Sequence, residues 1–351
     1  MIEVKNLKKS YGSFRALHGI SFTVERGHVY GFLGPNGAGK STTMNIITGC
    51  LAASDGSVTI NGHDIFSDPI EAKKCIGYLP EQPPLYLDMK VTEYLSFVGR
   101  AKGLRGGELY AQMDEVIDLT GLSQVHDRLI KNLSKGYKQR VGIAQAMIGN
   151  PEVIILDEPT VGLDPIQIIE IRDLIKSLAE SHTVILSSHI MQEISAVCDR
   201  IMIISGGKLV ADNTIEGLLS EYSKTVCLEL VCRTTKERLG EVLSNVSGVL
   251  EHEYKDTDTH GLCSALLTYA VDSDIREEVW KKLTAAGIMV LSMIPHVMTL
   301  EDIFISLTSA YVADDEDGDS YDEDADENED VDDSDDDSDD SDDSDYKPLF
   351  S

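Results

Sequence analysis

A glycine-rich loop near the start of the chain restricts its possible folds severely. The loop matches the phosphate-binding pattern GxxxxGK[ST] at every constrained position. Its residues are Gly34, Pro35, Asn36, Gly37, Ala38, Gly39, Lys40 and Ser41. The apolar run 29–33 predicts a buried strand before the loop, and residues 41–48 predict a helix after it. Because free N–H groups at a helix start attract anions, this unit predicts a nucleotide triphosphate site.

The residue types in the loop indicate separate tasks. We expect Lys40 to contact the β and γ phosphates as a positive point charge, and the Ser41 hydroxyl to bind Mg²⁺. Thr42 comes directly after the loop and is included with it among the nucleotide contacts. Ordinary residue usage would produce such a string by chance in roughly one chain in a hundred of this length.

Composition limits the class of protein. The 351 residues are 42% apolar, which suffices for two domains with hydrophobic cores. The net charge of −31 is concentrated in residues 314–345, whose 22 Asp and Glu leave 39 acidic against 30 basic residues elsewhere. A body this mildly acidic has no obvious polyanion-binding face, so we expect no nucleic acid partner. The six cysteines lack metal-ligand spacing, and no stretch reaches the roughly 18 apolar residues of a membrane span.

The segments between the motifs predict an open α/β sheet. Residues 1–33 alternate apolar and polar side chains as antiparallel strands do, and the apolar runs 153–156 and 183–187 predict buried strands. Residues 92–150 show helical periodicity, whereas the prolines within 80–90 predict a loop. Parallel strands separated by helices place a ligand at their carboxyl ends.

The chain changes character after residue 222. From 225 to 293 the predicted order of elements is β-α-β-β-α-β, that of a small α+β, ferredoxin-like domain, and 300–307 predict a final helix. Residues 313–345 are almost entirely Asp, Glu and Ser, a composition that predicts a disordered acidic tail. A weak divalent-cation sponge and a phosphorylated interaction arm are alternatives for this tail. The expected regions are 1–220, 221–312 and 313–351.

Four further motifs follow the phosphate loop in order. They are Leu133-Ser134-Lys135-Gly136-Tyr137-Lys138-Gln139-Arg140, Val153-Ile154-Ile155-Leu156-Asp157-Glu158, Gly162-Leu163-Asp164 and Ser188-His189. Together with the loop they resemble the nucleotide-binding domain of ATP-binding cassette (ABC) transporters, over about residues 1–220. The resemblance implies a P-loop NTPase fold of the ABC type, with an antiparallel β subdomain and a helical subdomain at about 86–150. It also implies ATP and Mg²⁺ as ligands.

The resemblance implies roles for single residues, and each role has a physical reason. Asp157 would hold Mg²⁺ through water, and Glu158 would polarise the water that attacks the γ-phosphate. Two adjacent carboxylates repel each other unless a cation is present. His189 is similar to the histidine that senses the γ-phosphate, and Tyr11 to an aromatic residue that stacks on adenine. A strand-end histidine or a turn tyrosine alone would indicate little.

Ser134 and Gly136 are predicted to begin a helix whose N-terminus can face a phosphate. In the family this phosphate belongs to ATP bound by the opposite subunit. The resemblance therefore implies a head-to-tail homodimer, or a pair of ATPases, with two ATPs at the interface, and Asp164 is counted among the ATP contacts. The usual LSGGQ motif reads LSKGY here, with Lys135 and Tyr137 as departures.

The position of the family's metal-sensing glutamine is ambiguous. Counting from Pro80 places it at Glu81, yet Gln82 is adjacent. We predict Gln82 as the metal ligand, together with Ser41 and Asp157.

The LSKGY motif, the loop YLPEQPPLY and the end of the C-terminal module resemble bacterial ABC-2 type exporter ATPases. The resemblance predicts an ATP-hydrolysing subunit that energises a separate membrane permease, with export as the expected direction. Such a subunit would be cytoplasmic and peripheral on the inner face of the membrane through its permease. The alternative is a soluble ABC ATPase acting on ribosomes or DNA. Such proteins usually carry two cassettes or a long coiled coil, and this sequence has neither.

Overall fold

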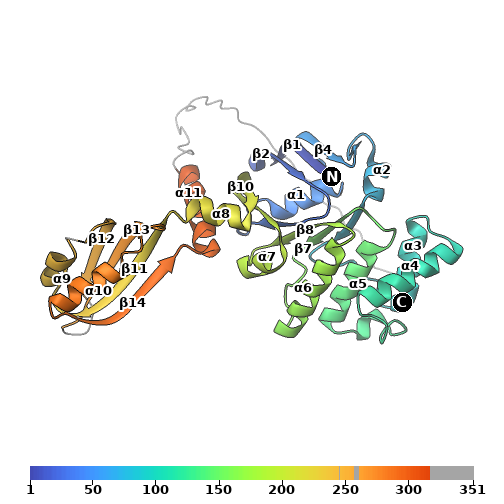
Figure 1. Cartoon of the computed structure of the whole chain (residues 1–351). Coiled ribbons are helices and arrows are strands. Elements are labelled where there is room, and N and C mark those ends of the chain that lie inside the picture. The colour runs from blue at the N-terminus through green and yellow to red at the C-terminus, as the bar shows by residue number, and fades with distance from the viewer. Residues whose placement is uncertain (245, 257–260, 317–351) are drawn as a thin grey trace, which may run out of the picture.

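The computed structural model describes residues 1–244, 246–256 and 261–316, and Figure 1 shows how their elements are arranged. Two sheets and their helices form the larger body. A third sheet with two helices stands beside it, connected through α8 (Ile215–Tyr222) and α11 (Leu300–Glu316). Over these described ranges, every helix is too short or too polar to cross a lipid bilayer.

The first sheet is antiparallel and has the strand order β2-β1-β4-β5. Its strands are β1 (Ile2–Tyr11), β2 (Phe14–Val24), β4 (Asp55–Ile60) and β5 (His63–Asp64). Val4 and its partner Phe22 are both buried, in keeping with the alternating pattern of the sequence. A tight turn joins β1 to β2, so Tyr11 and Phe14 are paired at the turn end of the hairpin.

The second sheet has six strands in the order β10-β9-β3-β8-β7-β6. They are β3 (Val29–Leu33), β6 (Ile76–Leu79), β7 (Val153–Asp157), β8 (Thr183–Ser188), β9 (Arg200–Ser205) and β10 (Lys208–Thr214). All neighbours except the β9–β10 pair are parallel. The carboxyl ends of β3, β6, β7 and β8 therefore meet at one edge, and the segments that follow them lie close together.

Both faces of the second sheet are covered. On one face Tyr30 and Phe32 of β3 share a core with α1 (Lys40–Ile47) and the antiparallel sheet. On the other face Val29 and Leu33 share a core with α5 (Lys135–Met147), α6 (Pro165–Ala179) and α7 (Met191–Val197). This explains why β3 has no charged side chain and only one polar group, the Tyr30 hydroxyl, which accepts a hydrogen bond from the Glu25 N–H.

A helical region packs on the same body. It contains α3 (Val91–Ala101), α4 (Gly106–Leu119), the short 3-10 helix Ile130–Asn132 and α5, and α2 (Pro69–Lys74) precedes it. The helices are interrupted between α3 and α4 and again after α4, and Gly103 and Gly121 in these connections have positive φ angles.

The third sheet has the order β12-β13-β11-β14 and a core of its own. Its elements follow the chain as β11 (Thr225–Arg233), α9 (Lys236–Leu243), β12 (Val249–Asp256), β13 (Cys263–Ala270), α10 (Arg276–Ala285) and β14 (Met289–Val297). Every neighbouring pair is antiparallel.

The last helix, α11, returns to the larger body, where it contacts α8 and β9. Leu300, Phe304 and Leu307 pack against the core to which β9 and α8 contribute, and the Ser205 hydroxyl donates to the carbonyl of Thr308. The sequence placed residues up to 312 with the C-terminal domain, whereas three apolar side chains of α11 pack, partly buried, on the larger body. The tail prediction for 313–351 lies outside the described residues except for 313–316, which belong to α11.

Candidate functional site

The loop 34–41 connects β3 to α1 and needs its glycines. A Cβ on Gly34 would lie 2.3 Å from the carbonyl oxygen of Ile204, and Gly39 adopts a left-handed φ of 106° against the Leu17 side chain. Gly39 is the N-cap of α1, with no side-chain cap and no acidic residue in the first turn. The first N–H groups of α1 are therefore left for an anionic ligand.

Lys40 places a positive charge inside this loop. Its ammonium donates hydrogen bonds to the carbonyls of Gly34 at 2.7 Å and Pro35 at 3.2 Å. Burial lowers the pKa of Lys40, and the carboxylates of Glu158, Asp157 and Glu81 act in the opposite direction. The ammonium thus lies between backbone carbonyls that accept its hydrogen bonds and a cluster of acids, where a phosphate chain with a cation would balance the charges.

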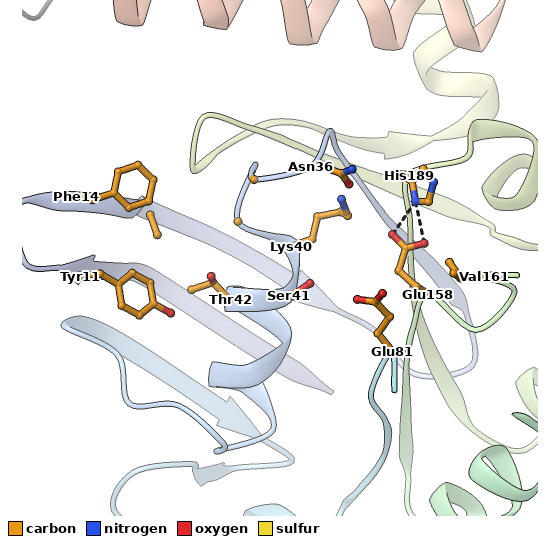
Figure 2. Close-up of a pocket in the computed structure, with 13 residues that line it drawn as sticks. Tyr11, Phe14, Asn36, Lys40, Ser41, Thr42, Glu81, Glu158, Val161 and His189 are labelled. Carbon is orange, nitrogen blue, oxygen red and sulfur yellow. Dashed lines mark hydrogen bonds and ion pairs between the residues drawn. The ribbon is translucent and has the colours of Figure 1, made fainter. Parts of the chain in front are cut away.

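An open cavity of about 430 Å³ lies along the loop. Figure 2 shows aromatic side chains at one end, the acids with His189 at the other, and Lys40, Ser41 and Thr42 between them. The lining residues are Tyr11, Phe14, Ala16, Asn36, Gly37, Gly39, Lys40, Ser41, Thr42, Glu81, Glu158, Val161 and His189. A nucleotide fits this arrangement, with its base on the aromatic end and its last phosphate at the acids. Gly34, Pro35 and Ala38 shape the loop without lining the cavity.

Phe14 is a lining residue that the sequence analysis missed. It is 64% exposed and lies across the hairpin end from Tyr11, which is 48% exposed. Two such exposed rings at the cavity mouth offer a stacking surface for a planar base. The turn between the two strands was visible in the sequence, so an aromatic residue on each side of it was an available signal.

Asp157 ends β7 and is nearly fully buried. Its carboxylate accepts a hydrogen bond from the Ser187 hydroxyl of β8. Burial raises its pKa, and the nearby charge of Glu81 acts in the same direction. A buried acid of this kind, beside the phosphate loop, is stabilised as an anion by a bound cation.

Glu158 is held in an unusual backbone conformation. Its φ of 49° is in the left-handed region, and its N–H donates to the Ser187 carbonyl at 3.2 Å and hydroxyl at 3.1 Å. Its carboxylate oxygens both lie 3.0 Å from Nδ1 of His189. A non-glycine residue in this region is strained, and such strain is maintained where surrounding contacts fix a functional side chain. Glu158 and His189 thus form an acid–base pair at the phosphate end of the cavity.

The structure separates the two residues considered for the metal-sensing position. Glu81, which follows β6, lines the cavity and points toward Glu158 in Figure 2, whereas Gln82 is not among the lining residues. Of the two, Glu81 is therefore the side chain that the chain directs at the acids after Pro80.

Ser134, Gly136 and Asp164 do not join the first cavity. They line a second cavity of about 450 Å³ with Gly121, Tyr137, Arg140, Ile166, Gln167 and Glu170. Ser134 caps α5 by accepting from the N–H of Tyr137, and Asp164 caps α6 by accepting from the N–H groups of Ile166 and Gln167. The predicted nucleotide contacts are therefore divided between two places on one chain.

Comparisons with known proteins agree with this geometry. A family profile described as ABC transporter matches residues 17–161. The linearmycin resistance ATP-binding protein LnrL of Bacillus subtilis is 34% identical over 316 residues, which cover 90% of this chain and 100% of that protein. The bacitracin transport ATP-binding protein BcrA of Bacillus licheniformis is 37% identical over 66% of this chain and 75% of its own.

A solved structure is also similar. It is a dimeric ATP-binding cassette in a post-hydrolysis state bound to ADP and Pi, with a TM-score of 0.56 and 28% identity over 61% of this chain and 98% of that chain. The predicted P-loop ABC ATPase fold is confirmed, and the transporter reading is favoured over the ribosome or DNA alternative. The chain belongs to the ATP-binding proteins of ABC transporters and is an ATP-binding, ATP-hydrolysing subunit.

Proposed function

We propose that this subunit energises a separate membrane permease, with export as its direction, from a position on the inner face of the membrane. The main support is that the predicted nucleotide contacts are divided between two cavities of one chain, as expected for a site shared by two subunits. Head-to-tail pairing of two subunits would place Ser134, Gly136 and Asp164 of each against the ATP held by Lys40 of the other. Relatives named for bacitracin transport and linearmycin resistance support export.

Mg²⁺ is the proposed cofactor, and the residues present fit it. Over the described part of the chain, no group of three or more His, Cys, Asp or Glu side chains could hold a metal without further ligands. Mg²⁺ typically binds through one or two carboxylates together with substrate phosphates and water. We assign Ser41, Asp157 and Glu81 as its protein ligands, directly or through water. When bound, the ion would neutralise charge that develops on the phosphates.

The remaining chemistry belongs to the chain itself. Lys40 and the N–H groups of α1 would orient the phosphates, and Glu158 would accept a proton from the attacking water. His189, 3.0 Å from the Glu158 carboxylate, would hold that carboxylate in place and contact the γ-phosphate. Tyr11 and Phe14 would stack on the adenine.

Substitutions at two neighbouring positions test the metal assignment. Glu81→Ala should lower the ATPase rate by about 10- to 100-fold and raise the Mg²⁺ concentration needed for half-maximal rate, since it removes a carboxylate beside Asp157. Gln82→Ala should change both quantities by less than about twofold, because that side chain lies outside the cavity. A magnesium titration of the ATPase rate distinguishes the positions, and the reverse ranking would restore Gln82 as the ligand.

An exposed aromatic cluster is the surface we assign to the permease. Tyr86 packs edge-on against Phe97 at 5.4 Å and against Tyr94 at 6.0 Å, yet Tyr86 and Phe97 are about half exposed. Exposed aromatic residues are typical anchors of protein interfaces. The short segment from Glu81 to Tyr86 connects the ATP cavity to this cluster. Movement of Glu81 when the dimer closes on ATP would therefore displace the surface that contacts the permease.

Co-purification from membranes tests the partner. The chain should recover a polytopic membrane protein, and the double variant Tyr86→Ala/Phe97→Ala should reduce that recovery at least about tenfold while the basal ATPase rate stays within about twofold. Tyr110→Ala, which removes another exposed tyrosine from α4, is the control. Recovery of ribosomal proteins without a membrane protein would contradict the proposal.

We further propose three regions. The first is the ATPase body of about residues 1–220, to which α11 is added by its packing. The second is a ferredoxin-like domain that begins at about 221, supported by the β-α-β-β-α-β order and the antiparallel sheet order β12-β13-β11-β14. The third is an acidic tail.

A further inference from the structure

A buried carboxylate beside the site has no role in the reaction as described so far. Glu193 on α7 is only 5% exposed. Among the described residues it forms no ion pair, and its Oε2 atom accepts hydrogen bonds from the hydroxyls of Thr160 at 2.5 Å and Ser188 at 3.0 Å. Burying a carboxylate is costly unless hydrogen bonds compensate for the lost water. A carboxylate kept here, with two hydroxyl partners, indicates a task beyond filling space.

The two partners of Glu193 come from different segments of the site. Thr160 lies two residues after Glu158, at the start of the loop that leads to Asp164. Ser188 directly precedes His189, and its hydroxyl also accepts the N–H of Ile190 at 3.0 Å, so the histidine lies within a closed turn. One carboxylate oxygen therefore connects the segment of the general base to the segment of the histidine.

We infer that Glu193 is a positioning residue for ATP hydrolysis, which holds the Glu158 and His189 segments at a fixed separation. The Glu158 backbone is strained, and its side chain meets His189 through atoms 3.0 Å apart, so small shifts of either segment would break the pair. Misplacement of a catalytic group by about 1 Å can cost roughly 100-fold in rate. The inference rests on the proposed roles of Glu158 and His189.

The same carboxylate is linked through Thr160 to the proposed dimer interface. Thr160 is fixed by Glu193, and the loop that follows carries Asp164, which lines the second cavity. A subunit that docks at the second cavity would thus press on a loop anchored to the histidine turn of the first site. This gives a short covalent and hydrogen-bonded path between the two cavities of one chain.

Steady-state ATPase assays on the full chain test the inference. Glu193→Ala should lower kcat about 10- to 100-fold with KM and ATP affinity within about twofold, because it disturbs geometry at the reacting end only. Thr160→Val, which removes one hydroxyl at constant volume, should lower kcat in the same direction. Glu193→Gln should retain most of the rate, since its amide oxygen can still accept both hydroxyls. Thr120→Val, which removes a buried threonine hydroxyl from the end of α4, is the matched control and should leave kcat unchanged.

A double-mutant cycle separates positioning from a general structural role. In a His189→Ala background, Glu193→Ala should cost less than about threefold, because a residue acting through His189 has little left to position. If the kcat losses of Glu193→Ala and His189→Ala simply multiply in the double variant, the inference is overturned. An unchanged kcat in Thr160→Val would overturn it as well. If Glu193→Ala does not fold, the cycle is measured with Thr160→Val in its place. Should His189→Ala and Glu158→Gln themselves leave hydrolysis intact, the proposed site would fail rather than the role of Glu193.

Discussion

Lys40→Ala should weaken ATP binding by at least about 30-fold and leave the fold intact. The substitution removes the ammonium at the centre of the phosphate loop, and truncation of one partner of a buried charge contact typically costs about 2–5 kcal/mol. Stability should change little, since burial already lowers the pKa of Lys40 and therefore opposes its charge in the folded protein. Equilibrium binding of labelled ATP and a thermal melt measure the two effects.

Lys138→Ala provides a control that removes a lysine from α5, away from the lining of the ATP cavity. It should bind ATP like the wild type. Wild-type affinity in Lys40→Ala would contradict the assignment of the phosphate loop. A melting temperature many degrees lower would instead show that Lys40 supports the fold.

Glu158→Gln should reduce the ATPase rate by about 100- to 10,000-fold while ATP and Mg²⁺ still bind. The amide keeps the size of the side chain and most of its hydrogen bonding, but it cannot accept the proton of the attacking water. The expected pattern is a large loss in kcat with nearly unchanged ATP affinity. Retention of more than about a tenth of the wild-type rate would assign the general base to another residue.

Glu152→Gln is the matched control for this loss. Glu152 precedes the same strand at its other end, where its carboxylate accepts from the exposed Asn61 and Arg26 side chains. Its substitution should leave the ATPase rate unchanged. A comparable fall in both variants would show that the sheet, and not the chemistry of Glu158, limits hydrolysis.

The sequence predicted the architecture of the site well because strand ends are marked by local pattern. The continuous apolar runs at 29–33 and 153–156 have no polar face, which is typical of strands covered on both sides, and the structure buries both faces. Asp157 and His189 follow such strands, so parallel topology alone brings them to one edge. The order of strands and helices along the chain was enough to predict both the buried strands and the residues at their ends.

The details that the sequence could not provide depend on side-chain direction and long-range packing. Glu81 and Gln82 are adjacent acid and amide residues after Pro80, and only the path of the chain beyond β6 decides which one faces the cavity. Phe14 joins the cavity because of the hairpin register, and Thr160, Ser188 and Glu193 meet through three separate elements. Helix α11 shows an apolar face in the sequence, but nothing local indicates which body covers it.

In the proposed dimer each chain provides half of each ATP site, and the Glu158→Gln variant allows this sharing to be measured. Because that variant binds ATP without hydrolysing it, it should run as a dimer on size exclusion with ATP and as a monomer without it. Adding Ser134→Arg should abolish the dimer, since the bulk and charge would occupy the place of the partner's γ-phosphate, yet labelled ATP should still bind the monomer. Loss of ATP binding by the monomeric double variant would show that Ser134 serves its own subunit and would contradict the shared site.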